Sequence, residues 1–150
     1  MKFEPLSPAN VELYIIYLKK ALLEEPDMML TAQIDEAAIK ERLCDPFYQS
    51  KKSLLAIEND DVVGRIEYHF YGCLQDGYRM AYVDWVYVLP EYRHRGIAQR
   101  LFGEFEKDCQ RNGIDQYYLF RATNQNADKF YSSFENATID DEPVLRKNIK

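Results

Sequence analysis

A nearly uncharged run at residues 80–88 most constrains how this chain can fold. Apart from Asp84, the run contains only apolar and aromatic residues, and Pro90, which cannot donate a hydrogen bond to a sheet, follows closely. Such a run predicts a central strand that is covered on both faces. Residues 97–111 then carry apolar side chains at helical spacing, which predicts a helix packed on that sheet.

The rest of the chain completes a mixed α/β pattern. Strands are expected at residues 2–5, 53–58, 62–71 and 117–120, a final hairpin within 138–149, and helices at 10–23, 34–43 and 124–134. This order predicts a central mixed sheet of about seven strands flanked by four helices. The unit from residue 80 to residue 120 should be a parallel, right-handed crossover. The length of 150 residues suits a single domain over residues 1–150.

Charge and cysteine content narrow the function classes. The net charge of −6 argues against a nucleic-acid or anionic-membrane partner, and no stretch approaches the roughly 20 apolar residues of a membrane span. Cys44, Cys73 and Cys109 are far apart and odd in number, which predicts free thiols in a reducing cytoplasm. His69 and His94 lack metal-ligand spacing, so no metal is expected.

The segment at residues 93–98 lies between the buried strand and the amphipathic helix. A helix start presents unpaired backbone N–H groups and a positive dipole end, and Gly96 would let an anion approach the backbone. Arg93 and Arg95 add positive charge beside it. The residues are consistent with a phosphate site and also with a plain strand-to-helix turn that carries surface arginines.

Two motifs together resemble the GNAT family of N-acetyltransferases. The segment at residues 93–98 is similar to the acetyl-CoA signature of that family, and residues 124–131 are similar to its second motif. The matching positions are Arg93, Gly96 and Ala98 in the first motif and Asn124, Ala127 and Tyr131 in the second. The resemblance implies a GNAT-like acyl-CoA N-acyltransferase fold and transfer of acetyl from acetyl-CoA to an amine.

The resemblance also implies which residues bind acetyl-CoA. Backbone amides of the first motif would hold the pyrophosphate, the end of the preceding strand would pair with the pantetheine arm, and the asparagine of the second motif would contact that arm near the acetyl end. The implied positions are Val86, Val88, Arg93, Arg95, Gly96, Ile97, Ala98 and Asn124.

Tyr131 is the expected catalytic acid. Its hydroxyl can protonate the leaving thiolate, since phenol and thiol pKa values differ by only about 1.5 units. The other interpretation is a packing tyrosine beside Phe130 and Phe134. Family members usually carry Gly followed by an aromatic residue shortly afterwards, where this chain has Glu135 and Asn136. Asn tolerates the left-handed conformation, so the helix can still end there.

Asp84 is the expected catalytic base, because a carboxylate inside an apolar strand is costly unless it is paired or functional. The alternative interpretation is an ion pair with an arginine such as Arg65 or Arg79. Glu67 and His69 share one strand and one parity, so either could act instead of Asp84, directly or through water.

The sequence therefore predicts a cytoplasmic enzyme that acetylates a primary amine directly. A small cationic acceptor (an amino sugar, an aminoglycoside or a polyamine) is favoured over a protein, and a homodimer is possible. The acceptor would be set mainly by residues 28–44, residues 72–77 and the final hairpin. The alternative function is a non-catalytic acyl-CoA-binding sensor or interaction module. A dinucleotide-binding protein is a poor fit, since GxGxxG and P-loop motifs are absent.

Overall fold

The computed structural model describes residues 1–29 and 31–149. The chain divides into two compact units, Met1–Phe120 and Arg121–Lys150, and each is described by itself. The single domain expected over residues 1–150 stays a prediction.

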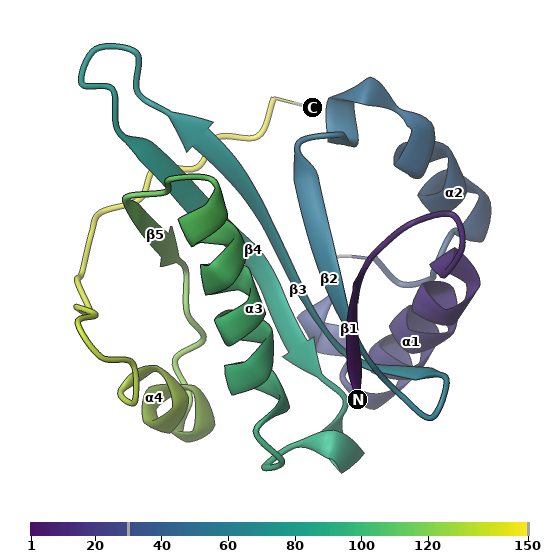
Figure 1. The fold of residues 1–150 in the computed structure, drawn as a ribbon. Coiled ribbons are helices and arrows are strands. Elements are labelled where there is room, and N and C mark those ends of the chain that lie inside the picture. The colour runs from purple at the N-terminus through teal and green to yellow at the C-terminus, as the bar shows by residue number, and fades with distance from the viewer. Residues whose placement is uncertain (30, 150) are drawn as a thin grey trace. The chain divides into compact units, whose positions relative to one another are not determined.

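The first unit contains a five-stranded mixed sheet with the order β1-β2-β3-β4-β5 (Figure 1). The strands are β1 (Lys2–Pro5), β2 (Lys51–Glu58), β3 (Asp61–Gly72), β4 (Arg79–Val88) and β5 (Gln116–Leu119). The first three pairings are antiparallel, and β4 pairs with β5 in parallel. Helix α3 (Ile97–Arg111) makes the crossover between them, as the sequence predicts.

Helix α1 (Val11–Glu24) covers one face of this sheet, with α2 (Glu36–Cys44) beside it (Figure 1). The α1 face of the sheet is defined by Leu55, Ile57 and Tyr87, which form one buried cluster with the apolar side chains of α1. The Tyr17 hydroxyl, on α1, donates a hydrogen bond of 3.1 Å to the Tyr87 carbonyl oxygen. The helix is thereby fixed to the strand that carries Asp84.

The opposite face of the sheet, the α3 face, is covered by α3 (Figure 1). Phe105 packs edge-on against Tyr68 and Tyr117, with ring centroids 4.7 and 5.0 Å apart. Cys109 lies on the same buried stripe and packs against the sheet. The helix ends just before Gly113, whose φ of +62° is a left-handed conformation that glycine adopts readily.

Short turns connect these elements. Asn59 and Asp60 both have positive φ, 52° and 64°, as the tight turn between β2 and β3 requires. Asp35 begins α2 by accepting a hydrogen bond of 3.0 Å from the Ala38 N–H. Three single turns of 3₁₀ helix are η1 (Pro26–Met28), η2 (Pro46–Tyr48) and η3 (Pro90–Tyr92).

The second unit contains α4 (Gln125–Tyr131), which is shorter than the helix expected over residues 124–134. Asn136 has the left-handed φ of +58° that the sequence allows, but it does not end the helix, because the C-cap of α4 is Ser132.

The hairpin expected within residues 138–149 is wrong, because these residues form no strand. The described sheet has five strands instead of about seven. Leu145 and Ile149 are largely exposed, Pro143 cannot donate to a ladder, and charged residues separate the few β-branched ones. The segment thus lacks the alternating apolar face that fixes a strand.

Candidate active site

Strand β4 contains one extra residue, Asp84, where its pairing with β3 shifts. Val83 pairs with Tyr68 and Trp85 pairs with Glu67, so Asp84 forms a β-bulge without a partner on β3. Strand β5 pairs with β4 no further than Val83. Among the residues that the structure describes, the second half of β4 therefore has no strand on its β5 side.

The backbone groups of Val86 and Val88 point toward this open edge. The Leu89 N–H donates a hydrogen bond of 3.0 Å to the Val63 carbonyl oxygen, so the backbone N–H and C=O of Leu89 point toward β3. Along an antiparallel strand these groups point to alternate sides, so those of Val86 and Val88 point away from β3. Arg93 Nε donates to the Val88 carbonyl oxygen at 3.0 Å, so the edge offers mainly the Val88 N–H and both groups of Val86.

The N-terminus of α3 follows directly, and no side chain caps it. The Arg100 N–H donates to the Gly96 carbonyl oxygen at 3.1 Å, so the N–H groups of Ile97, Ala98 and Gln99 have no partner within the helix. Gly96 has a φ of +73°, and a Cβ there would meet no atom within 4 Å. The first turn contains no acidic residue. The residues present thus fit a phosphate group, which backbone N–H groups would bind.

The two arginines of this loop are each paired with a carboxylate. Arg93 binds both oxygens of Glu25, at the end of α1, with distances of 3.0 and 2.8 Å. This hydrogen bonding by Arg93 is the main cause that lowers the pKa of Glu25. Arg95 contacts Glu58 at 2.8 Å. The positive charge expected from these two side chains is therefore balanced, which leaves the backbone N–H groups of the helix N-terminus as the groups that could bind an anion.

Asp84 projects onto the α1 face, where two side chains engage its carboxylate. Lys51 Nζ lies 2.7 Å from Asp84 Oδ1, and His69 Nδ1 lies 2.9 Å from Asp84 Oδ2. Lys51 Nζ is also 3.1 Å from His69 Nδ1. The three side chains come from β2, β3 and β4, and each is about one quarter to one third exposed. Asp84 is thus in an ion pair, as the alternative interpretation predicts, but its partner is Lys51 and not Arg65 or Arg79.

Glu67 lies beside this group with a buried arginine below it. Ser53 Oγ donates to Glu67 Oε2 at 2.8 Å, and the Arg65 guanidinium donates to the same oxygen at 3.1 Å. The same guanidinium also donates to the Tyr14 hydroxyl, and it packs over the Trp85 ring. On the α1 face, Glu67 thus forms an ion pair with Arg65, and Asp84 forms one with Lys51.

The predicted site residues of the second unit are placed within α4. Asn124 Oδ1 accepts a hydrogen bond of 2.9 Å from the Ala127 N–H and begins the helix. Tyr131 packs against Phe130 and Phe134, with ring centroids 5.0 and 5.8 Å apart. Burial raises the pKa of the Tyr131 phenol, against a smaller opposing effect of Arg121. A raised pKa keeps the phenol protonated at neutral pH, which an acid requires.

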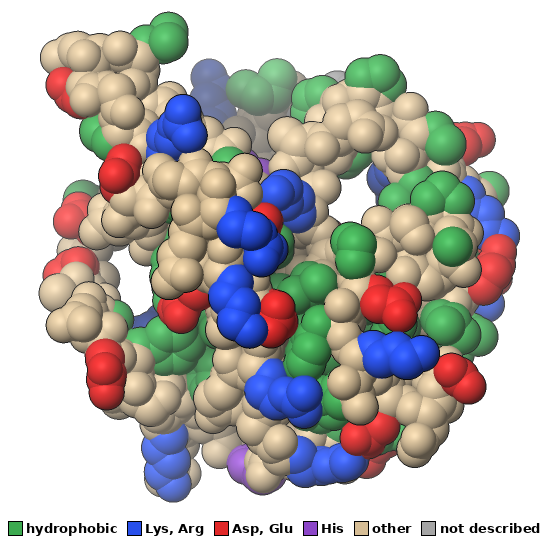
Figure 2. All heavy atoms as spheres, in the orientation of Figure 1, with side chains coloured by type: hydrophobic (Ala, Val, Ile, Leu, Met, Phe, Trp, Pro, Cys, Tyr) green, Lys and Arg blue, Asp and Glu red, His purple; other side chains and the backbone are tan. Residues whose placement is uncertain are grey.

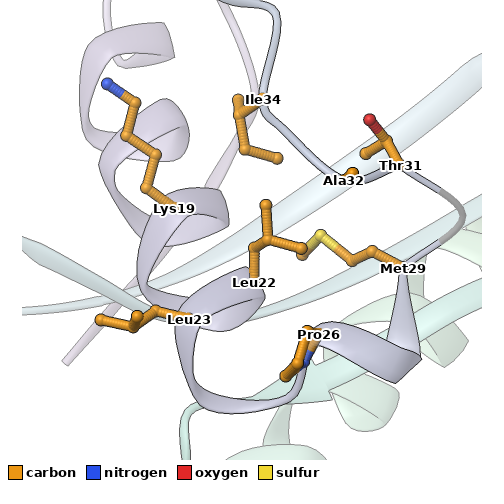
Figure 3. Close-up of a pocket in the computed structure, with 8 residues that line it drawn as sticks. All are labelled: Lys19, Leu22, Leu23, Pro26, Met29, Thr31, Ala32 and Ile34. Carbon is orange, nitrogen blue, oxygen red and sulfur yellow. The ribbon is translucent and has the colours of Figure 1, made fainter.

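The surface offers two further features. A cavity of about 700 Å³ lies between α1 and residues 26–29 and 31–34, where Leu22 and Met29 point toward one another (Figure 3). None of the predicted site residues is among the described residues that line it. Lys and Arg side chains gather over α3 and its neighbouring strands with acidic ones among them (Figure 2). These charges include the pairs Lys52–Asp108 and Lys107–Glu104, as expected for a solvated helix face.

The sequence predicts no role for Lys51, which forms an ion pair with Asp84, or for Glu25, which forms an ion pair with Arg93. Glu25 has no motif around it, and only the packing of α1 against η3 and β4 brings it to the loop. Lys51 lies opposite His69 only because the β2–β3 register shifts by one residue between Ala56 and Ile57.

A family model described as "Acetyltransferase (GNAT) family" matches residues 13–135. No curated protein matches the chain in sequence. Helices long and apolar enough to cross a membrane are absent from the described residues.

Solved structures of low sequence identity share the fold. An aminoglycoside acetyltransferase from an uncultured soil metagenomic sample, in complex with sisomicin, has a TM-score of 0.79 and 16% identity, covering 99% of this chain and 96% of that one. A ribosomal-protein-alanine N-acetyltransferase from Brucella melitensis biovar Abortus 2308 has a TM-score of 0.75 and 18% identity, covering 98% and 100%. Aminoglycoside N-acetyltransferase AAC(6')-Iy, in complex with CoA, has a TM-score of 0.70 and 16% identity, covering 98% and 99%.

Proposed function

Because the chain belongs to the acetyltransferase (GNAT) family, we propose that it transfers the acetyl group of acetyl-CoA directly to a primary amine. The observation that carries the proposal is the open edge of β4, which leads directly to the uncapped N-terminus of α3. A ligand with amide groups along an extended arm and a phosphate at one end matches this arrangement.

The roles of the binding residues follow from this placement. The N–H groups of Ile97 and Ala98 would bind the pyrophosphate, and Gly96 keeps the space above them open. Val86 and Val88 would pair through their backbones with the pantetheine arm. Arg93 and Arg95 would hold the loop in place through Glu25 and Glu58. Asn124 keeps the role near the acetyl end that its motif implies.

The chemistry requires one group that accepts a proton from the amine and one that protonates the leaving sulfur. The Asp84–His69 pair on the α1 face supplies the proton acceptor, and Tyr131 supplies the acid. Cys109 is unsuited to act as a nucleophile, because it is buried on α3 and its pKa is raised to about 12, chiefly by burial. The proposed transfer is direct, without an acetyl-enzyme.

A small cationic amine is the proposed acceptor, of the type of an amino sugar, an aminoglycoside or a polyamine. The net charge of −6 supports it, as does the fold shared with aminoglycoside acetyltransferases. The proposed location is the cytoplasm, where the three free cysteines stay reduced. A homodimer is compatible with this function and stays a prediction.

The test is a calorimetric titration with acetyl-CoA, followed by thiol release in the presence of a panel of primary amines. Binding together with thiol release for one class of amine is expected. Desulfo-CoA, which lacks the reacting sulfur, serves as the control for binding without transfer. Binding without release for any amine would favour the sensor or interaction module, and absence of binding would contradict the acetyl-CoA site.

A further inference from the structure

We infer that the atom that accepts the amine proton is Nε2 of His69, and that Asp84 acts as the residue that positions the His69 ring. The inference rests on the proposed function, because it names the base of that same reaction. It starts from the 2.9 Å contact between His69 Nδ1 and Asp84 Oδ2.

Both oxygens of the Asp84 carboxylate are already engaged. Oδ1 forms an ion pair with Lys51 Nζ at 2.7 Å, and Oδ2 contacts His69 Nδ1. An ionised carboxylate accepts hydrogen bonds only, so His69 must donate from Nδ1. Lys51 Nζ lies 3.1 Å from the same nitrogen and could only donate to it, which would favour the other tautomer. The contact to the negatively charged Asp84 is shorter and favours a proton on Nδ1, which leaves Nε2 with a free lone pair in the neutral ring.

The position of the ring suits a base for an incoming amine. His69 pairs with Tyr82 across β3 and β4, next to the bulge at Asp84 where the open edge of β4 begins. The His69 ring lies on the α1 face together with Lys51 and Asp84, so an acceptor would have to reach it from that face. His69 is about one quarter exposed on that face, and within the described part of the chain Nε2 has no protein partner.

The groups around His69 come from three strands. Lys51 on β2 and Asp84 on β4 are the charged groups in contact with it, and Glu67 follows on the same side of β3. Tyr82 and Tyr71 flank the ring, with centroids 5.6 and 6.1 Å away. Lys51 and Asp84 thus place one positive and one negative charge beside the ring.

The step balances as follows. The amine nitrogen forms a bond to the thioester carbonyl carbon and passes one proton to His69 Nε2. The carbon–sulfur bond breaks, and the sulfur takes the phenolic proton of Tyr131. The imidazolium proton returns to the phenolate through solvent as the products leave. The sum is one amine and one acetyl-CoA converted to one amide and one CoA thiol.

The first test measures the tautomer in the free protein by ¹⁵N nuclear magnetic resonance of the imidazole rings. The chain has two histidines, so the His94→Asn variant assigns the spectrum, and Asn suits the positive φ of 60° at that position. The neutral Nδ1–H form is expected for His69 in the wild type. The Asp84→Asn variant should shift it toward the Nε2–H form, because an amide can donate to Nδ1. A wild-type Nε2–H form would overturn the inference.

The second test compares the pH dependence of kcat/KM in the wild type and in His69→Gln. The variant should lose about a hundredfold or more in kcat/KM and should lack the acid limb of the wild-type profile. Tyr71→Phe, which keeps the ring contact to His69, is the matched control and should retain the wild-type profile. An unchanged profile in His69→Gln would overturn the inference and leave the proposed function standing. Absence of transfer by the wild type would overturn both.

Discussion

Tyr131 in α4 has two interpretations, a catalytic acid and a packing side chain, and only the first requires its hydroxyl. Tyr131→Phe keeps the ring contacts to Phe130 and Phe134 and removes only the proton donor. We expect kcat to fall by about a hundredfold, with little change in the affinity for acetyl-CoA. Steady-state kinetics and calorimetry on the same preparation measure both quantities. Wild-type kcat in the variant would remove Tyr131 from the acid role.

Gly96 combines a backbone requirement with a binding role. Gly96→Ala places a Cβ at a φ of +73°, which should lower the free energy of unfolding by about 1 kcal/mol. The Cβ would also occupy the space above the helix N-terminus, so the Kd for acetyl-CoA should rise about tenfold or more. Chemical denaturation and calorimetry measure the two effects.

The matched control for Gly96→Ala is Gly103→Ala in α3, where a Cβ also meets no atom within 4 Å. Since alanine favours a helix, this variant should have a free energy of unfolding about 0.5–1 kcal/mol higher and an unchanged Kd for acetyl-CoA. Equal affinity for acetyl-CoA in the two variants would contradict the phosphate site at Gly96.

At the scale of residues, the sequence predicts Asp84 and His69 as candidates but not their partner. Counting pairs outward from the turn at Asn59 and Asp60 would place Ser50 opposite His69. A β-bulge between Ala56 and Ile57 shifts the register and brings Lys51 to that place. Such a bulge depends on how the sheet packs between two helices, and no local pattern reveals it.

At the scale of elements, Asp108 connects α3 to two strands. Its carboxylate accepts hydrogen bonds from Lys52 Nζ at 2.8 Å and from the Tyr68 hydroxyl at 2.9 Å. Burial alone would raise the pKa of Asp108, but these hydrogen bonds outweigh it and lower the pKa. We expect Asp108→Asn to reduce the free energy of unfolding by about 2 kcal/mol at pH 7.

The pH dependence of that difference is a separate check. Because the folded pKa of Asp108 lies below the unfolded value of about 3.9, its contribution is fully present above pH 4. It is lost as the pH falls through the folded pKa, so the wild type and the variant should converge in acid. Urea unfolding across this range measures it. Asp61→Asn, at an exposed pair with Lys20, is the control and should change stability by less than about 0.5 kcal/mol.

The elements with the strongest patterns are the ones that the sequence predicts correctly. Strand β4 and helix α3 lie where the apolar run and the helical spacing place them, within one residue at each end. The prediction of a final hairpin is wrong because apolar and polar residues alternate only weakly over residues 138–149. Whether such a segment forms a strand depends on the surface against which it packs. The length of α4 was overestimated, since aromatic residues continue beyond its last turn.

At the scale of the whole molecule, the cysteines report on unfolding. Cys109 is 6% exposed and its pKa is raised to about 12, chiefly by burial, whereas Cys44 is exposed. At pH 8 a thiol reagent should therefore modify Cys44 quickly and Cys109 only after α3 separates from the sheet. Mass spectrometry of labelled peptides in increasing urea follows both sites. Rapid modification of Cys109 without denaturant would contradict the packing of α3.

The pairing of Arg93 with Glu25 ties the loop before α3 to the last turn of α1. The two segments are far apart in sequence, but a movement of one must either break the Arg93–Glu25 ion pair or move the other segment with it. Occupation of the loop by a ligand should therefore slow amide hydrogen exchange at the end of α1 as well as in the loop itself. The first helix would then act as a built-in reporter of whether the cofactor is bound.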